Sequence, residues 1–211
     1  MTTKKGHFIT FEGIDGSGKT TQIKLLRERI LLETRDDCYD TYEPSNGPVG
    51  SLLRQFLSGR MKTDERTMAA LFASDRLDHL FNETDGIYQK IEQGIHVLCD
   101  RYTLSNYAYQ GGKDSLDWVI SLNSKAESAL KPDCHIFIDV TPEIALQRIE
   151  AGRYCREIYE TEEQLTKIRA SYLSLFRMLK EKETILVING NQSVEKIADD
   201  IWNQVSNLFS V

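Results

Sequence analysis

The sequence contains few cysteines and few prolines. Its four cysteines lie far apart, so none forms the closely spaced pair that is typical of a zinc site or a redox dithiol. Two of them, Cys99 and Cys134, fall in apolar runs, and we expect reduced core thiols there. With only four prolines, no Pro/Gly/Ser-rich linker divides the chain. This composition predicts a single domain over residues 1–211.

Positive charge and long apolar runs are also scarce. Lys and Arg number 26 against 32 Asp and Glu, a formal net charge of -6 that disfavours general binding to nucleic acid or anionic membranes. No apolar run approaches membrane-spanning length, and no signal-peptide core follows the first residues. We therefore expect a cytoplasmic protein without nucleic-acid or membrane partners. Any phosphate group would have to be bound by a local cluster of donors.

Short apolar segments alternate with longer amphipathic ones. Because strands that alternate with helices form parallel sheets covered on both faces, the pattern predicts an α/β fold. The expected strands are His7–Phe11, Cys38–Tyr42, Ile95–Cys99, His135–Asp139 and Thr184–Ile188. The expected helices are Lys19–Glu33, Pro48–Leu57, Arg66–Leu80, Ile87–Gln93, Leu116–Leu130, Pro142–Glu150, Glu162–Lys182 and Val194–Leu208. Between two of these helices, residues 152–160 lose the periodicity, which predicts a short lid.

A glycine-rich loop follows the first expected strand. Residues 13–20 read Gly-Ile-Asp-Gly-Ser-Gly-Lys-Thr, the P-loop pattern in its required position between a strand and a helix. Its glycines let backbone N–H groups turn towards phosphate oxygens, and the helix N-terminus adds partial positive charge. Lys19 would neutralise the β- and γ-phosphates of ATP, and Thr20 would offer its hydroxyl to Mg2+. The loop therefore predicts a nucleotide triphosphate site.

Other features narrow the class of P-loop protein. A GTPase normally carries Asn-Lys-x-Asp, which is absent, and the only Asp-x-x-Gly begins at Asp15 inside the loop itself. Arginines are instead spread over several segments, at Arg54, Arg76, Arg101, Arg153 and Arg156. Two phosphorylated substrates that face each other need such donors, because the planar guanidinium binds phosphate oxygens in pairs. These observations favour a nucleotide kinase.

Five motifs resemble those of the thymidylate kinases, and they extend through most of the chain. They are residues 11–22 around the loop, Glu43-Pro44 with residues 47–50 and Arg54, residues 71–76 with His79, Asp100-Arg101-Tyr102 with positions 105–111, and residues 131–133 followed by 139–148. The resemblance implies the P-loop NTPase fold of nucleoside-monophosphate kinases, with a five-stranded parallel sheet. It also implies ATP and dTMP as substrates, Mg2+ as cofactor and a homodimer.

The resemblance also implies residue roles. Contacts to ATP would come from Gly13, Ile14, Asp15, Gly16, Ser17, Gly18, Lys19, Thr20 and Thr21. Contacts to the acceptor would come from Asp15, Glu43, Arg54, Phe72, Arg76, Arg101, Ser105, Asn106 and Tyr109. Among these, Phe72 would stack on thymine and Tyr109 would favour deoxyribose. Asp100 would hold Mg2+ through water, together with Thr20. The adenine pocket would include Asn189, Gly190 and Ser193.

The catalytic set implied by the resemblance depends on the lid. It comprises Asp15, Lys19, Arg101, Arg153 and Arg156. One group of the family places an arginine inside the P-loop, where this chain has Gly16, whereas another group supplies it from the lid. Because Arg153 and Arg156 fall in the expected lid, the chain resembles the second group. Tyr42 departs from the pattern, since many relatives have arginine there.

Simpler interpretations of the same residues stay open. Phe72 lies in an apolar helical stripe and also suits a core residue, and Arg54 also suits a solvated helix arginine. The alternative functions are a kinase of another nucleotide or of a deoxynucleoside, and a non-catalytic nucleotide sensor. An acceptor that is already a phosphate, with a second pKa of about 6, needs no strong base. We therefore expect Asp15 to orient the acceptor without deprotonating it.

Overall fold

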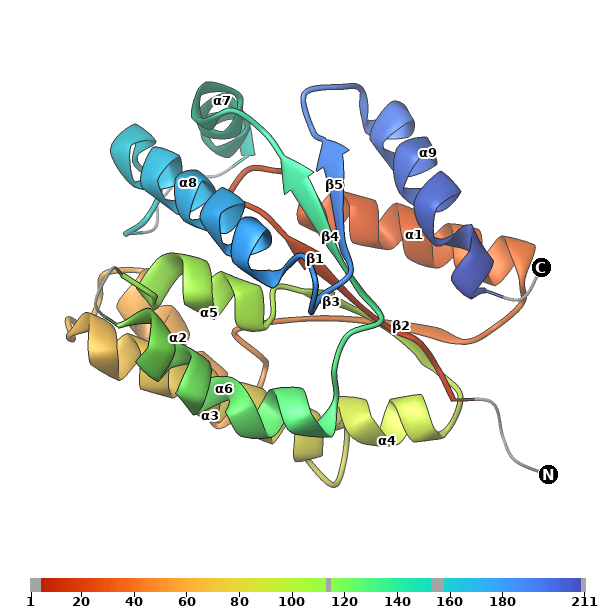
Figure 1. Ribbon diagram of the computed structural model, residues 1–211, viewed down its shortest axis with the longest axis horizontal. Helices are drawn as coiled ribbons and strands as arrows, with labels where there is room; N and C mark the ends of the chain where they lie inside the picture. The colour runs from red at the N-terminus through yellow and green to blue at the C-terminus, as the bar shows by residue number, and fades with distance from the viewer. Residues whose placement is uncertain (1–4, 113–114, 153–157, 210–211) are drawn as a thin grey trace.

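Five parallel strands form one sheet within residues 5–112, 115–152 and 158–209, the parts of the chain that the computed structural model describes (Figure 1). The strands are β1 (Phe8–Glu12), β2 (Cys38–Tyr42), β3 (His96–Asp100), β4 (Cys134–Asp139) and β5 (Ile185–Asn189). Their spatial order is β2-β3-β1-β4-β5. This is the predicted five-stranded parallel sheet of the P-loop fold, with strand bounds within one residue of those expected.

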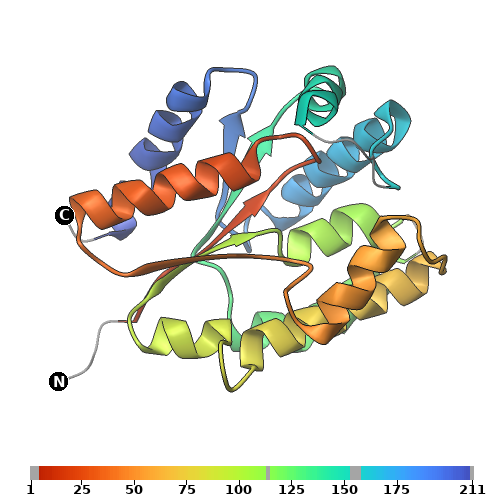
Figure 2. The same ribbon diagram turned by 180° about the vertical axis from the view of Figure 1, so that it is seen from behind.

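Helices cover both faces of the sheet. They are α1 (Lys19–Glu33), α2 (Pro48–Leu57), α3 (Glu65–Phe81), α4 (Ile87–Glu92), α5 (Thr103–Gln110), α6 (Leu116–Ala129), α7 (Pro142–Gly152), α8 (Glu162–Leu179) and α9 (Val194–Val205), followed by the 3-10 turn η1 (Ser206–Leu208). Helices α1 and α9 pack together on one face, whereas α3, α5, α6 and α8 pack on the other (Figures 1 and 2). None of the described helices is both long enough and apolar enough to cross a bilayer.

The order of the strands places a crevice beside β1. The chain leaves β1 towards one edge of the sheet, where β3 and β2 lie, and later adds β4 and β5 on the other side. In parallel α/β sheets, ligands bind at the carboxyl ends of strands where the strand order reverses in this way. The register aligns Phe11 with Asp100 and Glu12 with Phe137. The P-loop therefore begins next to the end of β3.

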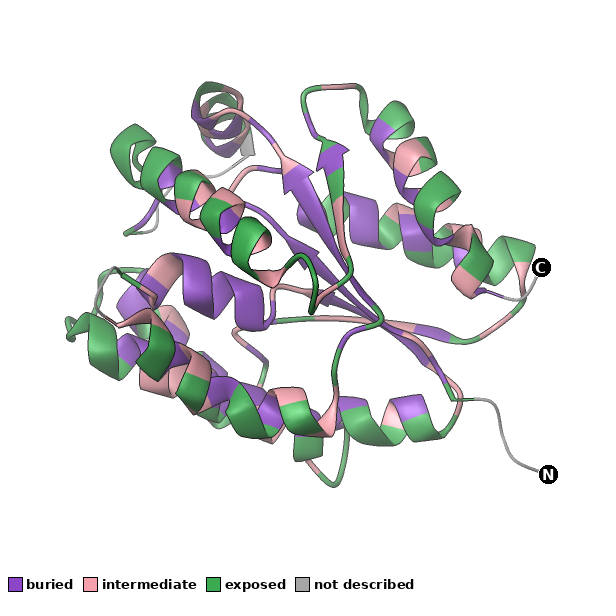
Figure 3. Cartoon of the chain, viewed as in Figure 1, coloured by how far each residue is buried: buried purple, intermediate pink, exposed green. Residues whose placement is uncertain are grey.

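The central strands are buried along their whole length (Figure 3). Every residue of β1 is buried, as are the first five residues of β4, whereas the edge strand β5 is partly exposed. The main core consists of these strands with apolar side chains from α1, α8 and α9 on opposite faces. Most residues that line the crevice lie on loops and helices joined to these and the neighbouring strands, so the core holds the lining in place.

The largest departure from the sequence prediction is α5, which we did not predict. It is short, and seven of its eight residues are buried, polar ones included, so it has no exposed polar face. The two largest differences between predicted and observed helix ends are at C-termini: α8 ends at Leu179 and α9 ends at Val205. The predicted lid begins where α7 ends, and residues 153–157 lie outside the described part of the chain.

Replacing Ile136 by alanine should lower the free energy of unfolding by about 2–5 kcal/mol. Ile136 lies inside β4 with no exposed surface, so the truncation leaves a cavity in the core. Val187→Ala is the control, because Val187 lies on the edge strand β5 and half of its surface is exposed. Urea denaturation measures both. Equal losses for the two variants would contradict this account of the core.

Candidate functional site

The P-loop turns sharply between β1 and α1. Gly16 and Gly18 have φ angles of 77° and 95°, a left-handed conformation that residues with a Cβ rarely adopt. At Gly16 an added Cβ would lie 2.4 Å from the carbonyl oxygen of Ala145 on α7. This backbone therefore has no room for a side chain at Gly16, the position where other members of the resembled family have arginine.

Lys19 opens α1 and points back into the loop. Its Nζ donates to the carbonyl oxygens of Gly13 and Ile14, both at 3.2 Å, and lies 4.0 Å from Asp100 Oδ1. Burial lowers the pKa of Lys19, with the positive charge of Arg101 adding to the effect, whereas Asp100 and Asp15 oppose it. An anionic ligand in the loop would therefore remove an electrostatic cost as well as gain a contact.

Thr20 and Asp100 meet at the edge of the loop. The Thr20 hydroxyl donates to Asp100 Oδ2 at 2.8 Å. The other oxygen, Asp100 Oδ1, is buried without a hydrogen-bond partner among the described residues. A hydroxyl beside a carboxylate with a free buried oxygen matches the oxygen ligands that Mg2+ prefers, either directly or through its bound waters. These residues fit the predicted metal position.

Asp15, Arg101 and Tyr109 form a tight cluster opposite Lys19. Arg101 Nη2 donates to Asp15 Oδ1 at 2.6 Å and to Tyr109 Oη at 3.0 Å, and the Tyr109 hydroxyl donates to Asp15 Oδ2 at 3.0 Å. Burial alone would raise the pKa of Asp15, but the charges of Arg101 and Lys19 and these hydrogen bonds hold it below its ordinary value. Asp15 is therefore an anion at neutral pH.

Arg101 is held in an unusual backbone conformation. Its φ angle is 73°, and its N–H donates to Phe11 O at 2.8 Å, which ties it to the end of β1. Its Nη1 donates to Gly13 O and to Ser105 Oγ, both at 3.1 Å. Strained residues of this kind occur where the surrounding structure imposes a geometry. Here the imposed geometry aims the guanidinium along the P-loop.

A buried carboxylate supports this arrangement from behind. Glu12, at the end of β1, accepts from the backbone N–H of Tyr102 at 2.9 Å, from Ser105 Oγ at 2.6 Å and from Tyr172 Oη at 2.9 Å. It has no exposed surface. No role was predicted for Glu12 from the sequence, because its position before a P-loop glycine does not by itself indicate a function.

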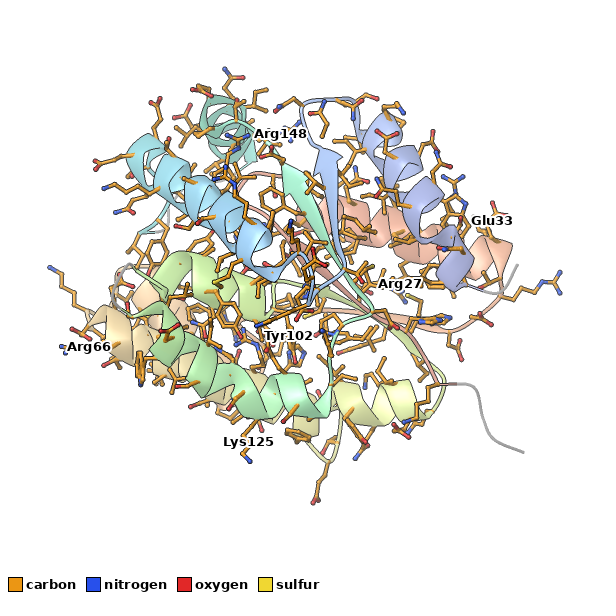
Figure 4. All side chains as sticks on the ribbon, in the orientation of Figure 1. Arg27, Glu33, Arg66, Tyr102, Lys125 and Arg148 are labelled. Atoms are coloured by element: carbon orange, nitrogen blue, oxygen red, sulfur yellow. The ribbon has the colours of Figure 1, made fainter. Side chains whose placement is uncertain are left out.

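Arg76 and Glu43 form a second buried ion pair. Arg76 Nη2 donates to Glu43 Oε2 at 2.6 Å, and its guanidinium carbon lies 5.0 Å from the ring centre of Tyr102. Figure 4 shows Tyr102 in the interior of the molecule. Arg76 Nε is buried and has no partner among the described residues. An unpaired buried donor at the wall of a cleft suits a ligand with an acceptor atom.

Arg54 lies on α2 and is half-buried. Its Nη1 donates to the carbonyl oxygens of Pro44 and Ser45 at 2.9 and 2.6 Å, and Nη2 donates to Ser51 Oγ at 3.0 Å. Arg54 is thus not a solvated helix arginine. Phe72 packs against the core and also lines the cleft, so a role in binding the base stays a prediction beside its place in the core.

Most of these side chains border one cleft of about 780 Å³, whereas Glu12 and Tyr172 lie behind its lining. The predicted residues that line it are Asp15, Gly16, Ser17, Gly18, Lys19, Thr20, Thr21, Glu43, Arg54, Phe72, Arg76, Asp100, Arg101, Ser105, Asn106 and Tyr109. Gly13 and Ile14 lie behind the wall, where their carbonyl oxygens accept from Lys19 and the Ile14 side chain joins the core. Arg153 and Arg156 lie outside the described residues, so their role stays a prediction.

Several residues of the cleft were missed from the sequence. Arg148 donates to Gly190 O at 3.0 Å and, more weakly, to Ser17 O at 3.4 Å, so it joins the P-loop to the expected adenine side (Figure 4). There Val194 and Ile197 form the wall next to the predicted segment. Gln110 and Tyr159 line the opposite end. Gln110 and Arg148 fall within the resembled motifs and Tyr159 within the expected lid, but no role was predicted for them, because their contacts form only when distant segments fold together.

Glu43, His79 and Cys99 also lie close enough to bind a metal ion together. Each already has another partner, however: Glu43 pairs with Arg76, His79 Nε2 with the Thr41 hydroxyl at 2.8 Å, and the Cys99 thiol donates to Arg101 O at 3.1 Å. Burial raises the pKa of Cys99 well above its ordinary value, so it is a thiol and not a thiolate. This cluster is better explained as hydrogen bonding than as a metal site.

Comparison with known proteins agrees with the geometry. The model of the family described as thymidylate kinase matches residues 11–201. A probable thymidylate kinase of Methanocaldococcus jannaschii is 38% identical over 203 residues, which cover 95% of this chain and 96% of the relative. A thymidylate kinase of Ligilactobacillus salivarius is 37% identical over 212 residues, covering 97% of this chain and all of the relative. The match spans the P-loop, the acceptor side of the cleft and the sheet between them, and the chain belongs to the thymidylate kinase family.

Proposed function

We propose that the protein transfers the γ-phosphate of ATP to dTMP, which gives ADP and dTDP, and that the cleft described above is its active site. The observation that carries this proposal is the position of Arg101. Its guanidinium contacts the P-loop, at Gly13 and Asp15, and also Tyr109 of α5 on the proposed acceptor side. A cation between two anion sites suits a reaction in which a phosphoryl group passes between them.

The donor side would be organised by the P-loop. Lys19 and the N-terminus of α1 would bind the β- and γ-phosphates of ATP, and Arg148, Val194 and Ile197 would border the adenosine part. When ATP binds, Lys19 would exchange its bonds to the two loop carbonyls for phosphate oxygens. This exchange keeps its charge next to the bond that breaks.

The acceptor side would be organised by arginines and a flat apolar wall. Arg101 and Arg54 would bind the 5′-phosphate, Phe72 would lie against the base, and Arg76 and Asn106 would bind its polar edge. Tyr109 is fixed to Asp15 and Arg101 and would leave little space beside C2 of the sugar. Asp15 would orient the acceptor as an anion, which agrees with its lowered pKa.

Thr20 and Asp100 would hold Mg2+, with Asp100 acting through bound water. When bound, the ion would neutralise charge on the β- and γ-phosphates. The short lid at residues 152–160, the arginines within it, the homodimer and the cytoplasmic location remain proposals that rest on the resemblance. Tyr159, inside the proposed lid, is buried and lines the cleft, which supports a lid that contacts the acceptor.

A panel of acceptors tests the activity. With Mg-ATP, we expect ADP release to be fastest with dTMP among dTMP, dUMP, dCMP, UMP, AMP, GMP and thymidine. Lys19→Ala should lower turnover by about 100-fold or more, since it removes a charge at the transferring phosphate. Lys24→Ala on the exposed side of α1 is the matched control. A clear preference for another acceptor would refute the substrate, and ATP binding without any transfer would favour the sensor interpretation.

Asp100→Asn should raise the Mg2+ concentration needed for half-maximal turnover by about 10-fold or more, because it removes a charge next to the metal. The KM for dTMP should change little, since Asp100 lies on the donor side. Titration of Mg2+ at fixed ATP measures the effect. Asp199→Asn on the surface of α9 is the control. An unchanged Mg2+ dependence would place the metal elsewhere.

The pH profile of Asp15→Asn separates orientation from base catalysis. We expect turnover to fall by about tenfold or more, whereas the acid limb near pH 6 should persist, because it belongs to the acceptor phosphate. Asp15 has a lowered pKa and is already ionised throughout this range, so its removal cannot abolish the limb. Asp85→Asn, on an exposed turn, is the control. Loss of the acid limb would show that Asp15 is a general base.

A further inference from the structure

A continuous chain of side-chain hydrogen bonds runs along the acceptor end of the cleft. Arg76 Nη1 donates to Asn123 Oδ1, and Asn123 Nδ2 donates to Asn106 Oδ1 at 2.8 Å. Asn106 Nδ2 then donates to Gln110 Oε1 at 3.0 Å, and Gln110 Nε2 donates to Tyr159 Oη at 3.3 Å. The chain ends where the Tyr159 hydroxyl donates to the Glu65 carboxylate at 3.0 Å.

The two ends of this chain of hydrogen bonds determine the direction of donation along it. A guanidinium can only donate and an ionised carboxylate can only accept, so Arg76 and Glu65 orient every amide between them. Asn123 is oriented a second time, because its Nδ2 also donates to the carbonyl oxygen of Val119 at 2.8 Å. The amide of Asn106 therefore has one favoured orientation, with Oδ1 towards Asn123 and Nδ2 towards Gln110.

Asn123 holds the central position without reaching the cleft. It lies on α6, has only 1% of its surface exposed and does not line the cleft, whereas its partners Arg76 and Asn106 both do. We propose that Asn123 is a positioning residue for base selection, which holds the guanidinium of Arg76 and the amide of Asn106 in the orientation that reads thymine. This proposal rests on the proposed function of the cleft.

The hydrogen-bonding groups that Arg76 and Asn106 leave unpaired explain how thymine would be selected over cytosine. Arg76 has its Nε–H free and can only donate, so it suits the carbonyl group of thymine and opposes the amino group that cytosine has instead. Asn106 keeps one N–H and one lone pair beyond the bonds that it makes in the chain. Which of the two faces a base depends on how its amide is turned. Because Asn123 sets that orientation, it acts on selectivity without touching the substrate.

Two variants of Asn123 test this role. Asn123→Ala removes both the acceptor of Arg76 and the donor to Asn106. Asn123→Asp is nearly the same size and still accepts from Arg76, but it cannot donate to Asn106, whose amide should then turn its N–H towards the new carboxylate. Val119→Ala is the matched control. Its side chain lies in the core one turn earlier on α6, so it should destabilise the helix without altering the polar chain.

For both variants, KM for dTMP and the Kd of dTMP measured by calorimetry should rise about tenfold, whereas KM for ATP should change less than twofold. The ratio of kcat/KM for dTMP over dCMP should fall about tenfold. In Val119→Ala both KM values and the ratio should stay within twofold of the unchanged protein, even if Tm falls. Asn123→Asp keeps the test valid if Asn123→Ala does not fold.

Two results would overturn the proposal. One is an unchanged dTMP-to-dCMP ratio in Asn123→Asp. The other is an equal rise of KM for both substrates, matched by Val119→Ala, which would mean that Asn123 has only a structural role. The Kd of dTMP measured by calorimetry tests the role of Asn123 even if a variant shows no turnover. Absence of dTMP turnover in the unchanged protein would instead refute the proposed function, so the two failures can be told apart.

Discussion

The guanidinium of Arg101 joins the P-loop to the proposed acceptor side of the candidate site. From one backbone position at the end of β3 it donates to Gly13 of the P-loop, to Asp15, to Ser105 and to Tyr109. A charged group that is buried to this extent is stable only if its hydrogen bonds are satisfied. The neighbouring residues therefore have to supply acceptors for it. The carboxylate of Asp15 accepts from it directly, and the carboxylate of Glu12 accepts from Ser105, which also contacts it.

The positive φ angle of Arg101 follows from the same requirement. Its N–H bonds to the end of β1, while its side chain has to lie along the loop that leaves that strand. Glu12 binds the next backbone N–H and the hydroxyls of Ser105 and Tyr172, which come from α5 and α8. Two helices and two strands thus meet at one buried carboxylate. The strain at Arg101 is offset by the hydrogen bonds that hold these elements together.

The acceptor end of the cleft follows a related principle with uncharged groups. Between the Arg76–Glu43 ion pair and Glu65, amide and hydroxyl groups are arranged in a single direction of donation. Buried polar networks of this kind are costly unless every member is satisfied, and when satisfied they allow one arrangement only. The proposed donor end would use backbone groups of the P-loop, which bind phosphate whatever the base. The proposed acceptor end would use side chains, which can distinguish one base from another.

Much of this could be predicted from local sequence. The five parallel strands were found because buried strands of a parallel sheet are short, apolar and separated by helices, and the P-loop was found because its spacing is set by backbone geometry. The resemblance supplied most of the cleft residues, and Lys19, Thr20, Asp100 and Arg101 do lie together. Helix α5 was missed because it is short and its polar residues are buried together with its apolar ones. Residues such as Glu12, Asn123 and Arg148 were missed because their partners lie between about 17 and 160 positions away.

The class of fold, the nucleotide loop and the family can be predicted from the amino-acid sequence, because they depend on residue types at fixed spacings along the chain. Which donors and acceptors face one another depends instead on how the helices and the sheet pack. The tertiary structure showed that Gly16 lies against Ala145, that Asp15 is held as an anion by Arg101 and Tyr109, and that Asn123 links Arg76 to Asn106. Hydrogen bonds and electrostatic interactions depend on distance and direction in space. Helices packed across a sheet set these quantities, and spacing along the chain does not.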